Sequence, residues 1–348
     1  MVEYNQLSYY VALLQELKQS TNKNLMRVSL SFTTEFVCFT IFTYRSYAYV
    51  KSPQKKGLHN YGEYMWSTVR NALCPNRHSF CTTVAPGFKE VQLLKDGSVD
   101  EFRKQAFGPA TPAIFPRGQF SNIPALTKWF IPQNRTWILN QEYLQSFGEA
   151  VVPLELTRFS PDANDTFQRF DAPLSAFLSW EIMADNNAGG VYLAQASITN
   201  LPQQLRSDVP VPSIVSHTGT GDIYDTNLWI GRAPTHTPLH RDPNPSLFVQ
   251  LAGRKLVKLF APDVGLEIFA RVNQTLGGHR SSVIRGEEMM VGEIKRALEE
   301  EVWGSTEKVS GFEAHLDRGD GLFIPKGWWH SIKGVGEGIT GSVNWWFR

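Results

Sequence analysis

The sequence contains little that would cross-link the chain, hold it in a membrane or draw it to nucleic acid. Its three cysteines, Cys38, Cys74 and Cys81, form neither a CxxC pair nor a zinc-binding spacing, so we expect free thiols in a reducing compartment. The net charge of +1 gives no global support for attraction to nucleic acid or to a membrane. The first residues carry no features of a secretory signal or transit peptide, so we expect a cytoplasmic or nuclear protein.

Long hydrophobic runs are also missing. In the apolar stretch of residues 29–50, the longest uncharged run, Phe36 to Tyr44, is far too short to span a bilayer, and we predict no membrane partner. Residues 1–19 have the spacing of an amphipathic helix, whereas the segment 51–57 is typical of a linker. We therefore predict residues 1–60 as an N-terminal extension of uncertain structure.

Aromatic residues are abundant: ten tryptophans and 22 phenylalanines indicate an aromatic-packed, β-rich interior. We predict residues 61–150 as a mixed α/β lead-in that packs on a barrel. Helical patterns within it cover residues 98–105, 125–130 and 140–147. The next segment, Val151–Leu156, is predicted as an edge strand because it contains Pro153.

From residue 190 onward, short β-type segments alternate with Gly/Pro/Asp turns, which is typical of a sandwich or barrel. The predicted strands cover residues 191–195, 222–230, 240–250, 255–260 and 340–347. Residues 261–317 are predicted as an insertion, in which Gly292–Trp303 has the pattern of an amphipathic helix.

The most informative feature is His240-Arg241-Asp242, followed far downstream by His330. In a β-strand, residues i and i+2 point to the same face, so His240 and Asp242 can share the inside of a barrel. Two histidines and one carboxylate form the facial triad of non-haem Fe(II) oxygenases, which leaves the opposite coordination positions open. The sequence therefore predicts an iron site held by His240, Asp242 and His330, where an oxo acid and then O2 can bind.

The residues before His330 indicate a barrel strand. A turn at Gly319–Gly321 precedes the apolar run Leu322–Ile324, which Pro325 ends. An early ligand pair and a late single histidine in a series of short strands indicate a double-stranded β-helix, the jelly-roll or cupin architecture. We therefore predict a mainly β fold with flanking helices, with its barrel in residues 151–348.

A second group of residues can hold an oxo-acid co-substrate. Lys255 lies on the strand after the ligand pair, and a lysine directed into an apolar barrel needs an anionic partner. Thr237 and Tyr192 can each place a hydroxyl nearby, and Asn344 on the last strand can donate an amide. Each residue taken singly has an ordinary structural explanation, but their joint placement around one triad indicates a 2-oxoglutarate site.

Five segments carry a family resemblance: Pro238–Pro243, Phe248–Lys255, Gly319–Pro325, Trp329–His330 and Ser342–Trp346. Together they resemble the JmjC family, and in particular its small cupin-like hydroxylases. The resemblance implies iron held by His240, Asp242 and His330, 2-oxoglutarate held by Lys255, Thr237 and Tyr192, and a pocket lined by Asn344 and Trp229. Ser246 stands where several relatives carry an asparagine, and a serine can still donate one hydrogen bond there.

The resemblance implies a 2-oxoglutarate-dependent dioxygenase that hydroxylates an Arg, Asn or Lys side chain of a protein or peptide. Three alternatives stay open: N-methyl-lysine demethylation, hydroxylation of a modified tRNA base, and a catalytically silent cupin that only binds. The near-neutral charge counts mildly against tRNA, because phosphate contacts need clustered Lys and Arg. A homodimer is compatible with the resemblance, and the substrate is not identified by the sequence.

Three further histidines are expected to be structural. His236 lies near the ligands and is expected to be packed or solvent-facing, while His279 and His315 lie in or near the predicted insertion.

Overall fold

The structure, a computed structural model, describes residues 84–85, 87–158, 165–183, 189–277, 289–304 and 310–348. The chain divides into two units, Met1–Phe80 and Cys81–Arg348, and all described residues belong to the second. The three cysteines and the predicted extension of residues 1–60 lie outside the described residues.

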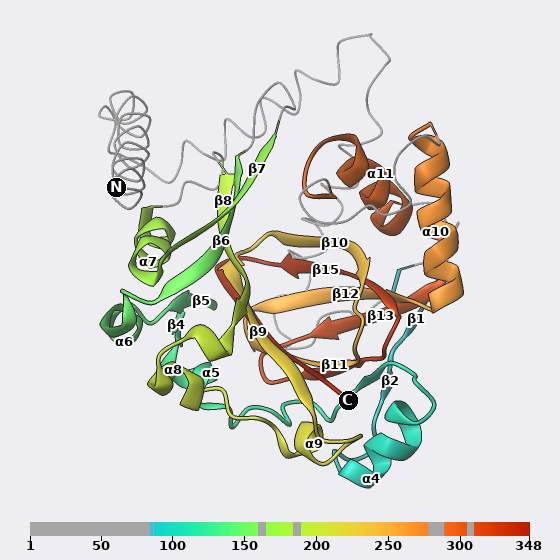
Figure 1. The fold of residues 1–348 in the computed structure, drawn as a ribbon, viewed down its shortest axis with the longest axis horizontal. Helices are drawn as coiled ribbons and strands as arrows, with labels where there is room; N and C mark the ends of the chain where they lie inside the picture. Colours follow the sequence, from blue (N-terminus) through green and yellow to red (C-terminus); the bar gives the residue numbers. More distant parts are fainter. Residues whose placement is uncertain (1–83, 86, 159–164, 184–188, 278–288, 305–309) are drawn as a thin grey trace, which may run out of the picture. The chain divides into compact units, whose positions relative to one another are not determined.

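Two β-sheets form the body of the described unit (Figure 1). The first has five strands in the order β1 (Phe88–Glu90), β13 (Gly311–Leu316), β12 (Arg254–Phe260), β15 (Trp329–Val335) and β10 (Thr235–Arg241). The second has nine strands in the order β2 (Gln92–Leu93), β3 (Ala113–Ile114), β14 (Gly321–Ile324), β11 (Ser246–Ala252), β16 (Ile339–Phe347), β9 (Ile223–Arg232), β8 (Gly189–Ser197), β6 (Val151–Arg158) and β7 (Thr166–Pro173). A separate hairpin joins β4 (Phe130–Gln133) to β5 (Thr136–Leu139).

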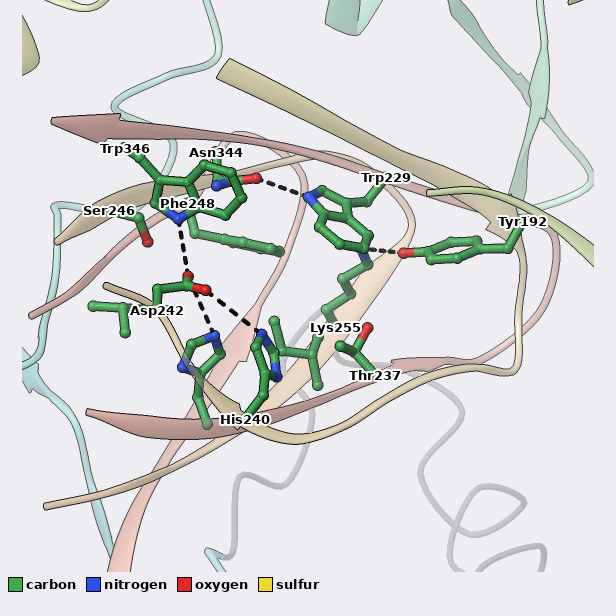
Figure 2. A pocket seen from close by; sticks show the side chains of 13 residues that line it. Tyr192, Trp229, Thr237, His240, Asp242, Ser246, Phe248, Lys255, Asn344 and Trp346 are labelled. Carbon is green, nitrogen blue, oxygen red and sulfur yellow. Dashed lines mark hydrogen bonds and ion pairs between the residues drawn. The ribbon is translucent and has the colours of Figure 1, made fainter. Parts of the chain in front are cut away.

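The two sheets pack against each other around a buried apolar cluster. Phe248 of β11 and Leu322 of β14 come from the nine-stranded sheet, whereas Val257 and Leu259 of β12 come from the five-stranded sheet. Beside this cluster, the same sheets enclose the pocket drawn in Figure 2. Sheets that close on each other in this way form a jelly roll, which confirms the predicted fold class.

Two long helices, α10 (Pro262–Thr275) and α11 (Gly292–Trp303), lie beside the five-stranded sheet (Figure 1). Ile268 of α10 and Leu298 of α11 share an apolar cluster with Phe260 of β12. The predicted helix has the bounds of α11, because its apolar residues recur with the helical period. The predicted insertion, residues 261–317, also contains β13, which pairs with β12 in the barrel. The domain boundaries stay a prediction.

The lead-in adds strands to both sheets: β1 pairs with β13, and β3 pairs with β14. Helices occur within its three predicted helical segments; Ser98 caps the first by accepting the backbone N–H of Glu101. Besides α10 and α11, the described helical segments are α4 (Val99–Phe102), η1 (Arg103–Phe107), α5 (Pro124–Lys128), α6 (Gln141–Leu144), η2 (Gln145–Phe147), α7 (Leu174–Met183), η3 (Ile198–Asn200), α8 (Gln203–Ser207) and α9 (Ser213–Ser216).

Two strand predictions were wrong. Residues 240–250 are not one strand, because Pro243 and Pro245 lack the N–H that a continuous ladder needs, and β10 and β11 lie on either side of them. Strand β6 is not at an edge but lies between β7 and β8. Its ladder with β8 begins at Leu154, so the missing N–H of Pro153 removes no bond from that ladder.

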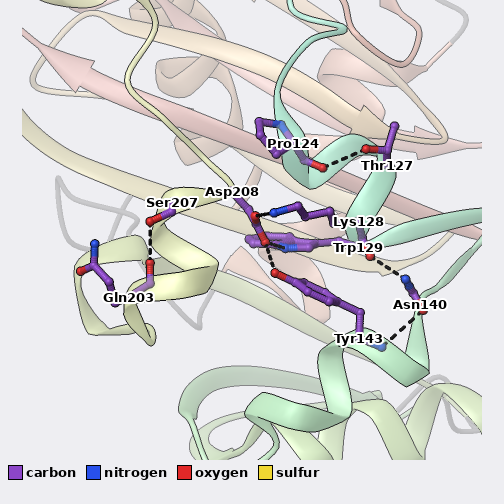
Figure 3. Close-up of polar contacts among 9 residues, drawn as sticks. All are labelled: Pro124, Thr127, Lys128, Trp129, Asn140, Tyr143, Gln203, Ser207 and Asp208. Atoms are coloured by element: carbon purple, nitrogen blue, oxygen red, sulfur yellow. Dashed lines mark hydrogen bonds and ion pairs between the residues drawn. The ribbon is translucent and has the colours of Figure 1, made fainter.

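A buried carboxylate ties three helical segments together (Figure 3). Asp208, which is 1% exposed, follows α8 and accepts hydrogen bonds from Lys128 Nζ at 2.6 Å, Trp129 Nε1 at 2.9 Å and the Tyr143 hydroxyl at 2.6 Å. Its backbone carbonyl also accepts the N–H of Ala125 at 2.9 Å. The segments around α5, α6 and α8 are therefore joined through one side chain.

We predict that Asp208→Ala lowers the free energy of unfolding by about 3 kcal/mol, because the buried indole N–H of Trp129 loses its acceptor. Lys128→Ala is the control, since the side chain of Lys128 is 48% exposed and an exposed ion pair contributes at most about 1 kcal/mol. Urea unfolding of both variants measures the difference, and equal losses would contradict the prediction.

Candidate active site

One pocket between the sheets holds all nine residues predicted for the site (Figure 2). They come from seven strands of the two sheets and from the turn after β10. The nine are Tyr192, Trp229, Thr237, His240, Asp242, Ser246, Lys255, His330 and Asn344. The fold thus brings together residues that are far apart in the sequence, while their individual roles stay predictions.

At one end of the pocket, His240, Asp242 and His330 each offer one ligand atom, and these atoms lie within 4.8 Å of one another. His240 and His330 are directly opposite each other on β10 and β15. Their Nε2 atoms lie 3.9 Å and 3.8 Å from the carboxylate oxygens of Asp242. Two imidazole nitrogens and one carboxylate oxygen at such separations fit a single Fe(II) ion as a facial triad.

The backbone determines which nitrogen of each ring faces Asp242. His240 Nδ1 lies 2.9 Å from the carbonyl oxygen of Pro238, and His330 Nδ1 lies 3.2 Å from that of Trp328. A ring nitrogen that donates to a carbonyl carries the proton, so the Nε2 of each neutral ring keeps its lone pair for a metal. Burial lowers the pKa of His330 to about 4, which keeps this ring neutral near pH 7.

Lys255 lies deeper in the same pocket and is 2% exposed. Its Nζ donates to the Tyr192 hydroxyl at 3.2 Å (Figure 2) and to the Ser342 hydroxyl at 2.6 Å. No ion pair involves Lys255 among the described residues. Burial lowers the pKa of Lys255 to about 7, because hydroxyl groups do not compensate for lost hydration as an anion would. This end of the pocket therefore suits a carboxylate ligand.

Two tryptophans orient polar groups of the pocket (Figure 2). Trp346 Nε1 donates to Asp242 Oδ2 at 2.9 Å, which holds the orientation of the carboxylate ligand. Trp229 Nε1 donates to Asn344 Oδ1 at 2.8 Å. Because the amide oxygen of Asn344 is occupied in this way, its NH2 group is the part left to donate to a ligand.

Ser342 and Trp346 are contact residues that the sequence reading missed. Both lie on β16, two residues to either side of Asn344, and residues two apart on a strand face the same side. Extending the alternation from Asn344 would have found them. Ser246 is buried directly opposite Trp346 in the neighbouring strand and lines the same pocket.

Two of the three histidines expected to be structural, His236 and His315, have contacts in the described part of the chain. His236 packs edge-on against Trp303, and its Nε2 lies 3.3 Å from the Ser331 hydroxyl, as expected for a packed residue. His315 Nε2 lies 2.9 Å from the buried carboxylate of Glu313. His279 lies outside the described residues.

Comparison with known proteins identifies the family. Residues 99–348, more than half of the chain, match the model of the cupin-like domain. The chain belongs to the cupin-like JmjC family. This JmjC chain is similar to "Lysine-specific demethylase JMJ30" of Arabidopsis thaliana, with 27% identity over 74% of the chain and 55% of that relative. It is also similar to "Jumonji C domain-containing protein 5" of Drosophila melanogaster (26% identity, 74% and 60%) and "Lysine-specific demethylase 8" of Xenopus tropicalis (27%, 72% and 51%).

The JmjC chain spans little more than half the length of these relatives. None of its helices in the described ranges is long and apolar enough to cross a membrane. The cytoplasmic or nuclear location and the homodimer stay predictions.

For the contact between Trp346 and Asp242, we predict that Trp346→Phe weakens Fe(II) binding by about 10- to 100-fold, because the ligand carboxylate loses the donor that orients it. Trp345→Phe is a matched control, since Trp345 is fully buried and its Nε1 has no hydrogen-bond partner in the part of the chain that the structure describes. Anaerobic metal titration measures both variants. Equal weakening would show that the effect comes from packing instead of from the hydrogen bond.

We also predict that 2-oxoglutarate binds more weakly as the pH rises above about 7. The carboxylate needs protonated Lys255, whose pKa is about 7 before the ligand binds, so the dissociation constant should rise up to about tenfold per pH unit. Anaerobic titrations of the Fe(II)-loaded protein from about pH 7 to about pH 9 test this. Lys255→Met should bind weakly without this slope, and a slope that persists in the variant would exclude Lys255 as its source.

Proposed function

We propose that this chain is an Fe(II)- and 2-oxoglutarate-dependent oxygenase. The proposal depends on one observation: one pocket carries a His/Asp/His triad at one end and, deeper inside, a buried lysine with no acidic partner among the described residues. A dicarboxylate with an oxo group beside one carboxylate matches both ends. When bound, Fe(II) and the oxo acid would supply electrons that activate O2, and O2 would be the oxidant that attacks a C–H bond.

The residues of the chain would bind the metal and the co-substrate, orient them, and exclude water from the pocket. His240, Asp242 and His330 would hold the metal, with the Asp242 carboxylate oriented by Trp346. Lys255 would bind the distal carboxylate of 2-oxoglutarate. The hydroxyl of Tyr192 can assist, since burial raises the pKa of this phenol and keeps it protonated as a donor.

Other side chains of the pocket would complete co-substrate binding. Thr237 and Ser246 offer hydroxyl groups in the lining, and Asn344 offers its NH2 group. Apolar side chains in the same lining exclude water from the reacting groups; these are Phe248, Ile324 and Ile332.

For the substrate, we propose the side chain of a protein or peptide, with hydroxylation of Arg, Asn or Lys as the first choice. The names of two relatives favour a second candidate, N-methyl-lysine demethylation, which attacks an N-methyl C–H bond with the same co-substrate. The names of the cited relatives give no support to a modified tRNA base.

Anaerobic titration with Fe(II) and then 2-oxoglutarate tests the proposed activity. We expect a visible metal-to-ligand charge-transfer band in the wild-type chain, no band in Asp242→Ala, and a weaker band in Lys255→Ala. Peptide turnover then separates the two candidates by mass spectrometry, since hydroxylation adds one oxygen atom whereas demethylation removes a methyl group as formaldehyde.

Circular dichroism of each variant shows whether it is folded. A folded wild-type chain that gives no band with Fe(II) and 2-oxoglutarate would overturn the oxygenase proposal. That result would favour the alternative of a cupin that binds a ligand without catalysis.

A further inference from the structure

A second cavity lies on the strands that extend the nine-stranded sheet beyond the barrel. It has a volume of about 450 Å³ and is formed by β6, β7, β8, β9 and the η3 turn. Five polar residues in its lining carry the argument that follows: Arg169, Asp171, Gln195, Asp225 and Asn227.

This polar cavity and the candidate active site are neighbours on one face of the sheet. Asn227 is directly opposite Asn344, and Asp225 is directly opposite Trp346, in the pairing of β9 with β16. Directly opposite residues point to the same side of a sheet, with Cβ atoms about 5 Å apart. Since Asn344 and Trp346 line the active-site pocket, the two cavities are separated by one strand spacing.

Asn227 is a buried residue of the cavity lining and carries an unpaired donor. Its side chain is 1% exposed, and its Nδ2 has no hydrogen-bond partner among the described residues. A buried donor without an acceptor is costly. A ligand that brings a carbonyl-type oxygen to this position would satisfy it.

Gln195 lines the same cavity from an unusual backbone position. It lies at the irregularity in the β8–β9 ladder between Leu193 and Ala196. Its backbone φ is 53°, a value that residues other than glycine seldom adopt. Its side chain is exposed, so packing does not account for the choice of residue. Gln195 therefore adds a second amide at the rim of the polar cavity, on the same side as Asn227.

The charge of the residues that line the polar cavity indicates which class of ligand it can bind. One arginine, Arg169, and two aspartates, Asp171 and Asp225, line it, so the ionised groups sum to one negative charge. This balance disfavours the phosphates of a nucleic acid, which need clustered positive charge. It is compatible with the neutral amides of a polypeptide.

We propose that the polar cavity is a subsite for a polypeptide substrate and accepts an Asn or Gln side chain about two residues from the reacting residue. Asn227 is two residues from Trp229, which lines the active-site pocket, and two residues of extended chain span about 7 Å. Asn227 donates to the carboxamide oxygen of the substrate, and Gln195 contacts the same group. This inference rests on the proposed function, because it assigns the second cavity to the same substrate.

Peptide libraries with a fixed central Arg, Asn or Lys, randomised at the flanking positions, test the subsite. The immobilised full chain is loaded with Fe(II) and 2-oxoglutarate under nitrogen, so that binding is measured without turnover. We expect enrichment of Asn or Gln two positions from the centre, on one side only. Enrichment should fall by roughly five- to tenfold in Gln195→Gly, a change that suits the positive φ, and in Asn227→Leu, which removes the unused donor at similar volume.

Gln168→Gly is the matched control. Gln168 is also exposed but lies opposite buried Leu156, on the other face of β6 and β7, so this variant should keep the enrichment. Melting temperatures show whether Asn227→Leu is folded, and Gln195→Gly tests the subsite at an exposed position if it is not.

The charge-transfer band, recorded on each sample, reports on the proposed function separately. A band without enrichment two positions from the centre, or enrichment that both variants keep, would overturn the subsite and leave the oxygenase proposal standing. Enrichment that both variants lose supports the subsite even where no band forms. Preference for a single-stranded RNA oligonucleotide over all peptides would also overturn it.

Discussion

The register of strand β15 is the constraint on which the candidate site depends. This strand pairs with β10 on one side and with β12 on the other. The first pairing sets His330 opposite His240, and the second fixes the strand that carries Lys255. Because side chains alternate between faces, a shift of one residue on either side would turn a ligand or the lysine away from the pocket.

Strand β16 adds the opposite wall and stabilises the core with its other face. Ser342, Asn344 and Trp346 contact groups of the pocket, while Val343 and Trp345 between them are fully buried. One strand thus contributes both to packing and to the placement of ligand-binding groups. Substitutions of the buried residues Val343 and Trp345 are therefore expected to act mainly on stability, and substitutions of the three residues that contact the pocket mainly on ligand binding.

The sequence was sufficient for features that depend on residue type and local period. The helix at Gly292–Trp303, the jelly-roll class and seven of the nine pocket residues follow from apolar periodicity, turn residues and the spacing of ligand types, whereas Trp229 and Ser246 came from the family resemblance. Contacts that depend on cross-strand register were not predictable in the same way. The partner of Asp242 is Trp346, and nothing local in either segment indicates that these two side chains meet.

The interior position of β6 was missed for a related reason. Pro153 excludes a hydrogen bond only at its own N–H, and the local sequence does not show where the ladder with β8 begins. The polar cavity beside the site is equally a product of tertiary structure. Asn227 has no distinctive sequence context; what sets it apart is its burial while no described residue accepts a hydrogen bond from its Nδ2.

Lys255 makes the stability of the chain and its affinity for a dicarboxylate respond to pH in opposite directions. Its pKa is 10.5 in an unfolded chain and about 7 when buried without a ligand, so between these values the unfolded chain holds more of this proton. The contribution of Lys255 to stability therefore improves as the pH rises from about 7 to about 10.5, while ligand affinity declines. Near neutral pH, the dicarboxylate would stabilise the folded state by binding to it, so the chain would be more resistant to unfolding when its co-substrate is abundant.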